Sequence, residues 1–350
     1  RIKLIMAFTT INKSTDYFTP ELYVGTGSSR TISTLNFQPD WVWIKNRGTN
    51  DRHSLFDAVR AAPNMLTSNA NEAQSAQPSE LTAFNANGFT VNNATSVNGS
   101  SANYVSWNWK ANGTGSSNTA GSINSTVSVN TTSGFSIVKY VGNASQSQTV
   151  GHGLGVAPKL IIFKSSTSAD DWSICFPSVL GVDGRLTLNT SAANAIGDNT
   201  FWNSVAPSST LFSLGNNTRA NASGQTIIAY CFAEKQGYSK MGSYTGNGNT
   251  NGTFVYTGFK PAYVIAKRTD GTSNWNQFDN KRFGFNVKNP LLYPNLTNLE
   301  ADDVFIDLLS NGFKWRTTNG DINASGGSYI YMAFAEAPLV GTNNVPATAR

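Results

Sequence analysis

The chain has 350 residues, of which 39% are hydrophobic and only 13% are charged, and its formal net charge is +5. A chain of this length is expected to hold two or three domains. The lack of a long run of lysines or arginines argues against nucleic acid as a partner, and no apolar stretch reaches the roughly eighteen residues of a membrane span.

The first segment, 1–5, is basic and apolar but too short to be a secretory signal peptide. Met6 reads as a natural initiation point, so we predict that residues 1–5 are an upstream extension. From there on, the polarity of the chain comes from Asn, Ser, Thr and 31 Gly residues. These residue types favour turns and exposed strand faces over helix interiors, so we expect many short strands.

One apolar strand that ends in a lysine occurs three times, each time after a turn that contains proline. The three copies are 37–45, 156–164 and 259–267. A second strand, rich in aromatic and small residues, occurs in the same order at 104–109, 227–234 and 329–336. Because two independent elements repeat at roughly 100 to 120 residues, which is too long for a solenoid or a propeller blade, we interpret each period as one β-sandwich.

Four tryptophans of the first copy alternate along their strands. Trp41 and Trp43 share one strand face, and so do Trp107 and Trp109. We predict that these faces pack into a core, and the alternative is a platform on which sugars stack.

Asparagine marks several predicted turns. Asn87-Gly88 and Asn311-Gly312 lie between alternating apolar residues, which indicates hairpins, and 212–216 is a weaker version in the second copy. Many Asn-x-Ser/Thr triplets, the glycosylation signal, also occur, for example at 221–223 and 323–325. In a chain so rich in Asn and Ser we assign them little meaning.

These patterns predict an all-β fold of three tandem, divergent β-sandwich units of the jelly-roll or concanavalin-like type. We place the units at 1–115, 116–236 and 237–350, and the last ends in an extended polar tail. The polar stretch 112–118 is typical of a flexible linker. The tight junction at 235–237 predicts that the second and third units pack closely.

The sequence offers no convincing metal or nucleophile cluster. His53 and His152 are the only histidines, and Cys175 and Cys231 lie in apolar runs away from both. Structural zinc sites combine such residues at short spacing, so we predict that His152 is a turn residue bonded to the backbone. The two thiols are expected to be buried and free, although a single bridge between them stays open.

Acidic residues give two candidate groups, Asp170-Asp171 and Glu300 with Asp302 and Asp303. A glycoside hydrolase would need two carboxylates that face one cleft, and Ca²⁺ would need several oxygen ligands from flexible loops. Asp is also a common turn residue. We therefore predict no catalytic residue and no cofactor, and keep Ca²⁺ as an alternative.

Aromatic residues in exposed loops are the usual sugar contacts of β-sandwich proteins. Four residues outside the paired tryptophans are candidates for glycan contact: Trp202, Trp315, Tyr244 and Tyr256.

Five segments resemble a family of lectin-like structural proteins of tailed bacteriophages, often marine or cyanobacterial. The segments are 6–11, 37–45, 55–60, 151–158 and 229–234, and the resemblance covers nearly the whole chain from Met6. It implies a concanavalin-like sandwich, a place in the virion and no enzymatic activity, and it assigns no residue roles.

We therefore predict a non-enzymatic structural protein at the surface of the extracellular particle. It would be a tail-fibre or appendage subunit or a capsid decoration, because repeated rigid sandwiches suit an extended appendage. Its expected partners are other virion proteins, further copies of itself in a homo-oligomer such as a trimer, and a host surface glycan. The alternatives are a free carbohydrate-binding protein without a structural role and, less favoured, a glycan hydrolase.

Overall fold

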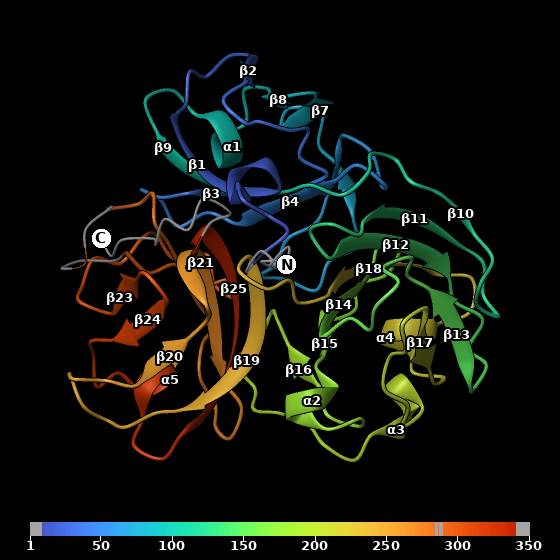
Figure 1. Cartoon of the computed structure of the whole chain (residues 1–350). Coiled ribbons are helices and arrows are strands. Elements are labelled where there is room, and N and C mark those ends of the chain that lie inside the picture. The colour runs from blue at the N-terminus through green and yellow to red at the C-terminus, as the bar shows by residue number, and fades with distance from the viewer. Residues whose placement is uncertain (1–8, 284–285, 287–289, 341–350) are drawn as a thin grey trace, which may run out of the picture.

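The computed structural model describes residues 9–283, 286 and 290–340, and over this range the chain is all-β, as predicted. Met6 and most of the predicted C-terminal tail lie outside the described residues. No helix in the described part of the chain is both long and apolar enough to cross a membrane. Figure 1 shows three groups of strands arranged around a common centre.

Three large antiparallel sheets contribute most of the strands. The first has the order β1 (Phe18–Val24), β9 (Asn103–Trp109), β3 (Trp41–Asn46) and β4 (His53–Asp57). The second has the order β10 (Ser116–Asn118), β11 (Ser125–Asn130), β12 (Phe135–Val141), β18 (Thr226–Phe232), β14 (Leu160–Ser165), β15 (Ser173–Cys175) and β16 (Leu186–Thr187). The third has the order β19 (Ser239–Thr245), β25 (Ser328–Pro338), β21 (Phe259–Arg268) and β22 (Asn276–Asp279).

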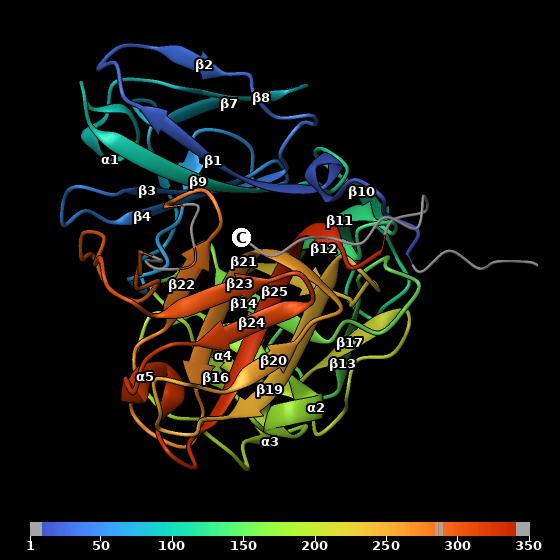
Figure 2. The same ribbon diagram turned by 60° about the vertical axis from the view of Figure 1, so that its left-hand side comes forward.

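A small sheet covers the outer face of each large sheet. The small sheets are β2 (Arg30–Ile32), β8 (Gly88–Val91) and β7 (Leu81–Asn85); β13 (Gln148–Gly151) and β17 (Leu211–Leu214); and β20 (Phe254–Tyr256), β24 (Gly312–Trp315) and β23 (Ile306–Leu309). A separate hydrophobic cluster fills each space between small and large sheet. Figure 2 shows β2, β8 and β7 stacked over the first large sheet.

The remaining elements are short. They are β5 (Asn64–Met65), β6 (Ser75–Ala76), the 3-10 helix η1 (Ser14–Asp16), and the helices α1 (Thr95–Asn98), α2 (Pro177–Leu180), α3 (Asn199–Trp202), α4 (Thr218–Asn221) and α5 (Gly320–Asn323). Helices α1, α4 and α5 each lie just before the strand that closes a predicted unit.

The large sheets share one register, which lets their positions be aligned residue by residue. The first residues of β1, β12 and β19 pair in turn with Trp109 of β9, Phe232 of β18 and Phe334 of β25. Strands β3, β14 and β21, which carry the repeated lysine, pair with the same three residues from the other side. The pairing residue is the first of the strand in β3 and β14 and a central one in β21. The three large sheets can thus be aligned position by position, and we keep the predicted units as names for the three parts.

The inner faces of the three large sheets meet in one aromatic core. Trp41 stacks on Tyr230 with ring centroids 4.4 Å apart, Phe18 stacks on Phe334 at 5.0 Å, and Phe232 contacts Phe334 edge-on at 5.9 Å. Each contact joins a different pair of units, and offset or edge-on aromatic pairs stabilise beyond the area that they bury. The predicted burial of the tryptophan faces is confirmed, and each unit packs against both others.

Equivalent hydrogen bonds close the three units into a ring. Backbone N–H groups donate across the junctions from Gln74 to Ser166 O, from Asn194 to Thr269 O and from Glu300 to Arg47 O, at 2.8–2.9 Å. A side chain repeats the pattern at each junction: Trp172 Nε1 donates to Thr67 O, Trp275 Nε1 to Thr187 O, and His53 Nε2 contacts Tyr293 O at 3.1 Å. The third junction therefore uses a histidine where the other two use tryptophan.

Acid is expected to loosen the junction between the first and third units. His53 is fully buried and its Nδ1 accepts a hydrogen bond from Trp43 Nε1 at 2.8 Å. Burial, followed by the charge of Lys45, holds the pKa of His53 well below its usual value. The unfolded chain takes up this proton below about pH 6.5 while the folded chain does not, so the free energy of unfolding should fall by up to about 1.4 kcal/mol per pH unit.

Urea unfolding of the wild type and His53→Gln between pH 7 and 5.5 measures this effect. In the variant, the free energy of unfolding should fall less steeply with decreasing pH, by the amount that one proton contributes. His152, whose pKa burial also lowers, supplies the matched comparison in His152→Gln. An unchanged slope in His53→Gln would contradict the prediction.

The lysines that end the three repeated strands are buried. Each Nζ donates to the carbonyl of the following residue, at 2.6 Å in Lys45 and 2.7 Å in Lys164 and Lys267. Lys164 and Lys267 also donate to the neighbouring unit, to Asn71 O at 3.2 Å and Ser191 O at 3.4 Å. Burial lowers the pKa of all three lysines to about 8. Lys164 and Lys267 are thus part of a junction, whereas Lys45 Nζ donates within its own unit, to Asn46 O and to Thr49 O at 2.9 Å.

Both predicted hairpins form, but the glycines act differently from the prediction. The β7–β8 turn consists of the two residues before Gly88, and Gly312 likewise starts β24. A Cβ atom on Gly88 would lie 1.7 Å from Ile32 O, and one on Gly312 would lie 2.1 Å from Val255 O. Glycine is therefore required for close approach of the next strand rather than for the turn itself.

The predicted flexible linker at 112–118 is instead tied to its surroundings. The N–H of Asn112 donates to Ser128 Oγ at 2.8 Å, and the N–H of Gly113 donates to Asp40 Oδ1 at 3.1 Å. Ser116–Asn118 then pairs with β11 as β10. The linker prediction is wrong, because backbone N–H groups of this segment bond to side chains of neighbouring elements and its last residues pair with β11.

Cys175 and Cys231 are buried and free, as expected. Both pair with Ile161, which lies between them in the sheet. Burial raises the pKa of both thiols.

Candidate functional site: a groove between the first and second units

Three of the four aromatic residues predicted to contact glycans lie in hydrophobic cores. Trp202 and Trp315 are buried, and Tyr244 is only 9% exposed. The interpretation of these three as exposed loop aromatics is therefore wrong. Tyr256 is 48% exposed on β20, and Lys240 Nζ lies 5.3 Å from its ring centroid. Of the four candidates, Tyr256 alone is exposed to solvent.

Three residues of the predicted acidic groups have basic or backbone partners. Asp171 pairs with Arg219 at 2.7 Å, and Glu300 pairs with Arg47 at 2.8 Å. Asp303 accepts the N–H of Val304. In the part of the chain that the structure describes, no three His, Cys, Asp or Glu side chains gather closely enough to hold a metal ion.

His152 bonds to the backbone around its turn. Its Nδ1 accepts the N–H of Leu154 at 3.2 Å, and its Nε2 contacts Ser208 O at 3.2 Å. Both ring nitrogens thus have backbone partners, as predicted for a turn residue.

A groove of about 670 Å³ lies at the junction between the first and second units, which we call the first groove. Its size is that of typical small-molecule sites. The second unit supplies most of the lining from β11, β12, β18 and the connection after β14, and the first unit supplies two long side chains. The lining residues are Arg60, Gln74, Ser117, Ile123, Asn124, Ser125, Thr126, Lys139, Tyr140, Val141, Ser166, Thr167 and Thr226.

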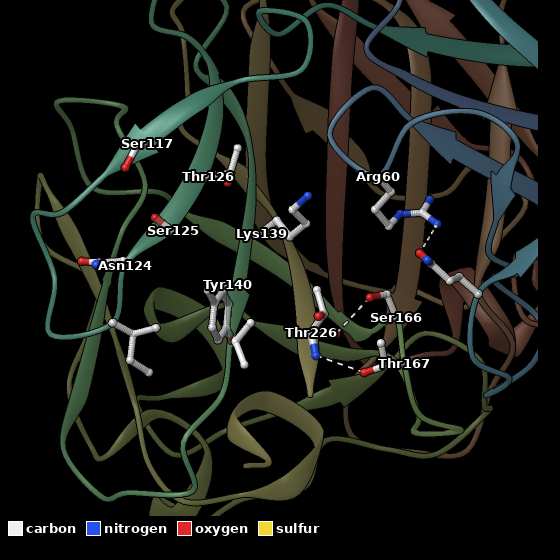
Figure 3. A pocket seen from close by; sticks show the side chains of 13 residues that line it. Arg60, Ser117, Asn124, Ser125, Thr126, Lys139, Tyr140, Ser166, Thr167 and Thr226 are labelled. Carbon is white, nitrogen blue, oxygen red and sulfur yellow. Dashed lines mark hydrogen bonds between the residues drawn. The ribbon is translucent and has the colours of Figure 1, made fainter. Parts of the chain in front are cut away.

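The first groove carries positive charge. Arg60 Nε donates to Asp57 Oδ2, so the charge of Arg60 is compensated. Lys139 points from β12 towards the side on which Arg60 lies (Figure 3), and its Nζ donates to Val59 O at 3.2 Å. None of the described lining residues is Asp or Glu, and Lys139 has no carboxylate partner among the described residues. One ammonium therefore remains uncompensated, and two of its three donors remain for a ligand.

Hydroxyl and amide side chains line the same groove. Ser166 Oγ donates to Thr226 O, and Thr167 Oγ1 accepts the N–H of Thr226, as Figure 3 shows. These bonds fix one part of the groove lining, and Val141, which pairs with Thr226, adds a 52% exposed apolar surface. The combination of one cation, several hydroxyls and a small apolar surface can bind a polar, hydroxylated anion.

Sequence reasoning missed this groove because its walls come from distant segments. Gln74 meets the second unit through the bond from its N–H to Ser166 O, and Arg60 Nη1 lies 3.5 Å from Gln74 Oε1. The sequence does contain one indication of the groove. Lys139 lies on a strand whose other inward-facing positions, such as Phe135 and Ile137, are apolar.

Comparison with protein-family models matches residues 13–338 to a family described as "Domain of unknown function (DUF7483)". No curated protein and no solved structure matches the chain.

Proposed function

The chain belongs to this family of domains of unknown function, and from that premise we propose that it is a non-enzymatic structural or adhesion protein that binds an acidic glycan in the first groove. The observation that carries the proposal is the uncompensated Lys139 among hydroxyl groups and an exposed apolar side chain. A sugar acid presents carboxylate, hydroxyl and C–H surfaces, which match these three kinds of group.

The closed ring supports a structural role. Every unit contacts both others through the aromatic core and through the junction hydrogen bonds, so the three units hold the grooves at fixed positions. Binding sites on such rigid elements keep their geometry without ordering costs on binding.

We propose a virion location for the protein on the strength of the sequence resemblance to tailed-phage proteins, either in a tail appendage or as a capsid decoration. Labelled antibody imaged on purified particles tests this proposal. Label at the tail or capsid is expected, together with a homo-oligomer in solution. A soluble monomer in the lysate with unlabelled particles would favour the free carbohydrate-binding protein instead.

Replacing Lys139 by Gln is expected to weaken the binding of an acidic oligosaccharide at least tenfold. The variant keeps a polar side chain of similar reach but removes the charge, and a tenfold loss corresponds to about 1.4 kcal/mol of binding free energy. Isothermal titration with trigalacturonate at low ionic strength measures it, and binding should weaken as salt is raised.

The matched control is Lys13→Gln, which removes an exposed lysine that pairs with Asp16 and is not part of the groove lining. This control should bind trigalacturonate like the wild type. If the wild type fails to bind acidic oligosaccharides at millimolar concentration, or if Lys139→Gln binds as tightly as the wild type, the proposed glycan site is wrong.

A further inference from the structure

A second groove of about 640 Å³ lies at the junction between the second and third units. It is the positional counterpart of the first groove, because the shared register of the large sheets aligns the two linings. The aligned pairs are Lys139 with Ser243, Tyr140 with Tyr244, and Thr226 with Ser328. Two junctions of the ring thus carry grooves of nearly the same volume at the same place.

Both cations of the first groove have uncharged counterparts in the second groove. Lys139 is replaced by the exposed hydroxyl of Ser243. Arg60 is replaced by Val179, which occupies the same place in the connection after β15 that Arg60 occupies after β4. The second groove therefore lacks the feature that selects an anion in the first.

The charge that does line the second groove is already neutralised. Asp270 Oδ1 accepts Arg268 Nε at 2.7 Å, and its Oδ2 accepts the N–H of Ser328 at 3.1 Å. Beside this pair, Ile196 is 76% exposed within the lining, and Thr269 adds a hydroxyl. The surface thus combines hydroxyl groups with an exposed aliphatic side chain and has no uncompensated charge.

The third junction has an ion pair at the corresponding place. Arg47 and Glu300 are the counterparts of Ser166 and Gln74, by the junction hydrogen bonds. Arg47 Nε and Nη2 donate to the Glu300 carboxylate at 3.0 and 2.8 Å, and Arg282 Nη1 donates to it at 3.1 Å. The three junctions thus differ in chemistry: one basic groove, one neutral groove and one ion-paired contact.

We propose that the second groove is a second binding site, specific for an uncharged saccharide. The inference rests on the proposed function in assigning both grooves to glycans, but it concerns separate residues. An uncharged sugar presents hydroxyl edges and a C–H face, which correspond to the hydroxyls of Ser243 and Thr269 and to the side chain of Ile196. The ring would then hold two sites of different specificity at a fixed separation.

Replacing Ile196 by Ser tests the site through its apolar contact. The probes are maltotriose, mannotriose and galactotriose, with binding followed by saturation-transfer NMR and titration calorimetry on the full chain. At least one trisaccharide should bind the wild type, and Ile196→Ser should weaken it at least fivefold. The matched control Val205→Ser alters another exposed aliphatic side chain outside the groove and should leave affinity unchanged.

Replacing Ser243 by Lys gives a test in the opposite direction. This variant copies Lys139 into the second groove and should raise the stoichiometry of trigalacturonate binding from one to two. No trisaccharide binding to the wild type, or equal binding by wild type and Ile196→Ser, would overturn the second site even if trigalacturonate still binds the first. Trisaccharide binding that Ile196→Ser weakens, without any trigalacturonate binding, would instead overturn the proposed function of the first groove alone.

Discussion

Replacing Asp57 by Ala is expected to lower the free energy of unfolding by about 3–5 kcal/mol, because it leaves a buried charge without its partner. Asp57 is fully buried at the end of β4. Its Oδ2 accepts Arg60 Nε and, from the neighbouring unit, the hydroxyl of Tyr230 at 2.8 Å, while its Oδ1 accepts the N–H groups of Val59 and Arg60. Removing the carboxylate therefore leaves a guanidinium, a hydroxyl and two backbone N–H groups without their acceptor.

Urea unfolding at pH 7 measures this loss, and the ring supplies its own control. The second unit places Phe176 and Val179 where the first has Asp57 and Arg60, and Met332 corresponds to Tyr230 in the shared register. The triple variant D57F/R60V/Y230M copies this apolar junction and should recover much of the stability, since a well-packed apolar substitute for a buried ion pair is often neutral or better. A loss below about 1 kcal/mol in Asp57→Ala would contradict the prediction.

The strands could be predicted from the sequence because their signals are local. Alternation placed Trp41 with Trp43 and Trp107 with Trp109 on common faces, and all four are buried there. The repeated lysine marked the same position in each large sheet, although its burial was not foreseen. Lysine is almost never fully buried unless its ammonium is satisfied, and here backbone carbonyls of two units satisfy it.

The ring and its grooves could not be predicted, because they depend on contacts between units. Nothing in the local pattern around Gln74 indicates that its N–H will bond to Ser166 O. A tandem repeat is equally compatible with a rod and with a closed ring. The fit between the inner aromatic faces of the units determines which of the two arrangements forms. The same limit explains Trp202 and Trp315, whose burial depends on the strands that pack over them.

Replacing Asn221 by Ala is expected to cost about 3 kcal/mol of unfolding free energy, since each buried polar group left unpaired costs about 1–3 kcal/mol. Asn221 is fully buried at the end of α4. Its Nδ2 donates to Ser145 O at 2.9 Å and Gly215 O at 2.7 Å, and its Oδ1 accepts the N–H of Asn143 at 2.9 Å. One side chain thus joins α4 to two loops of the second unit, the β12–β13 connection and the segment after β17.

The same device recurs in the other two units. Asn98 at the end of α1 accepts the N–H of Thr26 and donates to two carbonyls, and Asn323 at the end of α5 accepts the N–H of Asn247. Each asparagine lies at the same distance before a closing strand. The triplets at 221–223 and 323–325, which sequence reasoning set aside, therefore mark a repeated structural residue. Because the Asn221 side chain is buried, a glycan attached there would be incompatible with the fold.

Asn221→Asp separates this role from a simple loss of packing, because it keeps the shape of the side chain but turns an acceptor towards two carbonyls. At pH 7 it should destabilise the fold more than Asn221→Ala, since the carboxylate is buried without a cation. The folded state then favours the protonated acid, so the pKa of the new carboxyl is raised and the variant should gain stability as the pH falls from 7 towards 4.5. Because the buried histidines contribute the same acid-induced loss to both variants, the gain is measured as the stability of Asn221→Asp relative to Asn221→Ala, which should rise across that range in urea unfolding. The control Asn217→Asp, at the N-cap of α4, keeps the bond that Oδ1 accepts from the N–H of Arg219 and loses only the bond that Nδ2 donates to Thr200 Oγ1 at 3.0 Å, so it should destabilise the fold much less than Asn221→Asp, because Asp and Asn are equally good N-caps. Equal stability of Asn221→Asp and Asn217→Asp would show that the two donated bonds of Asn221 do not stabilise the unit.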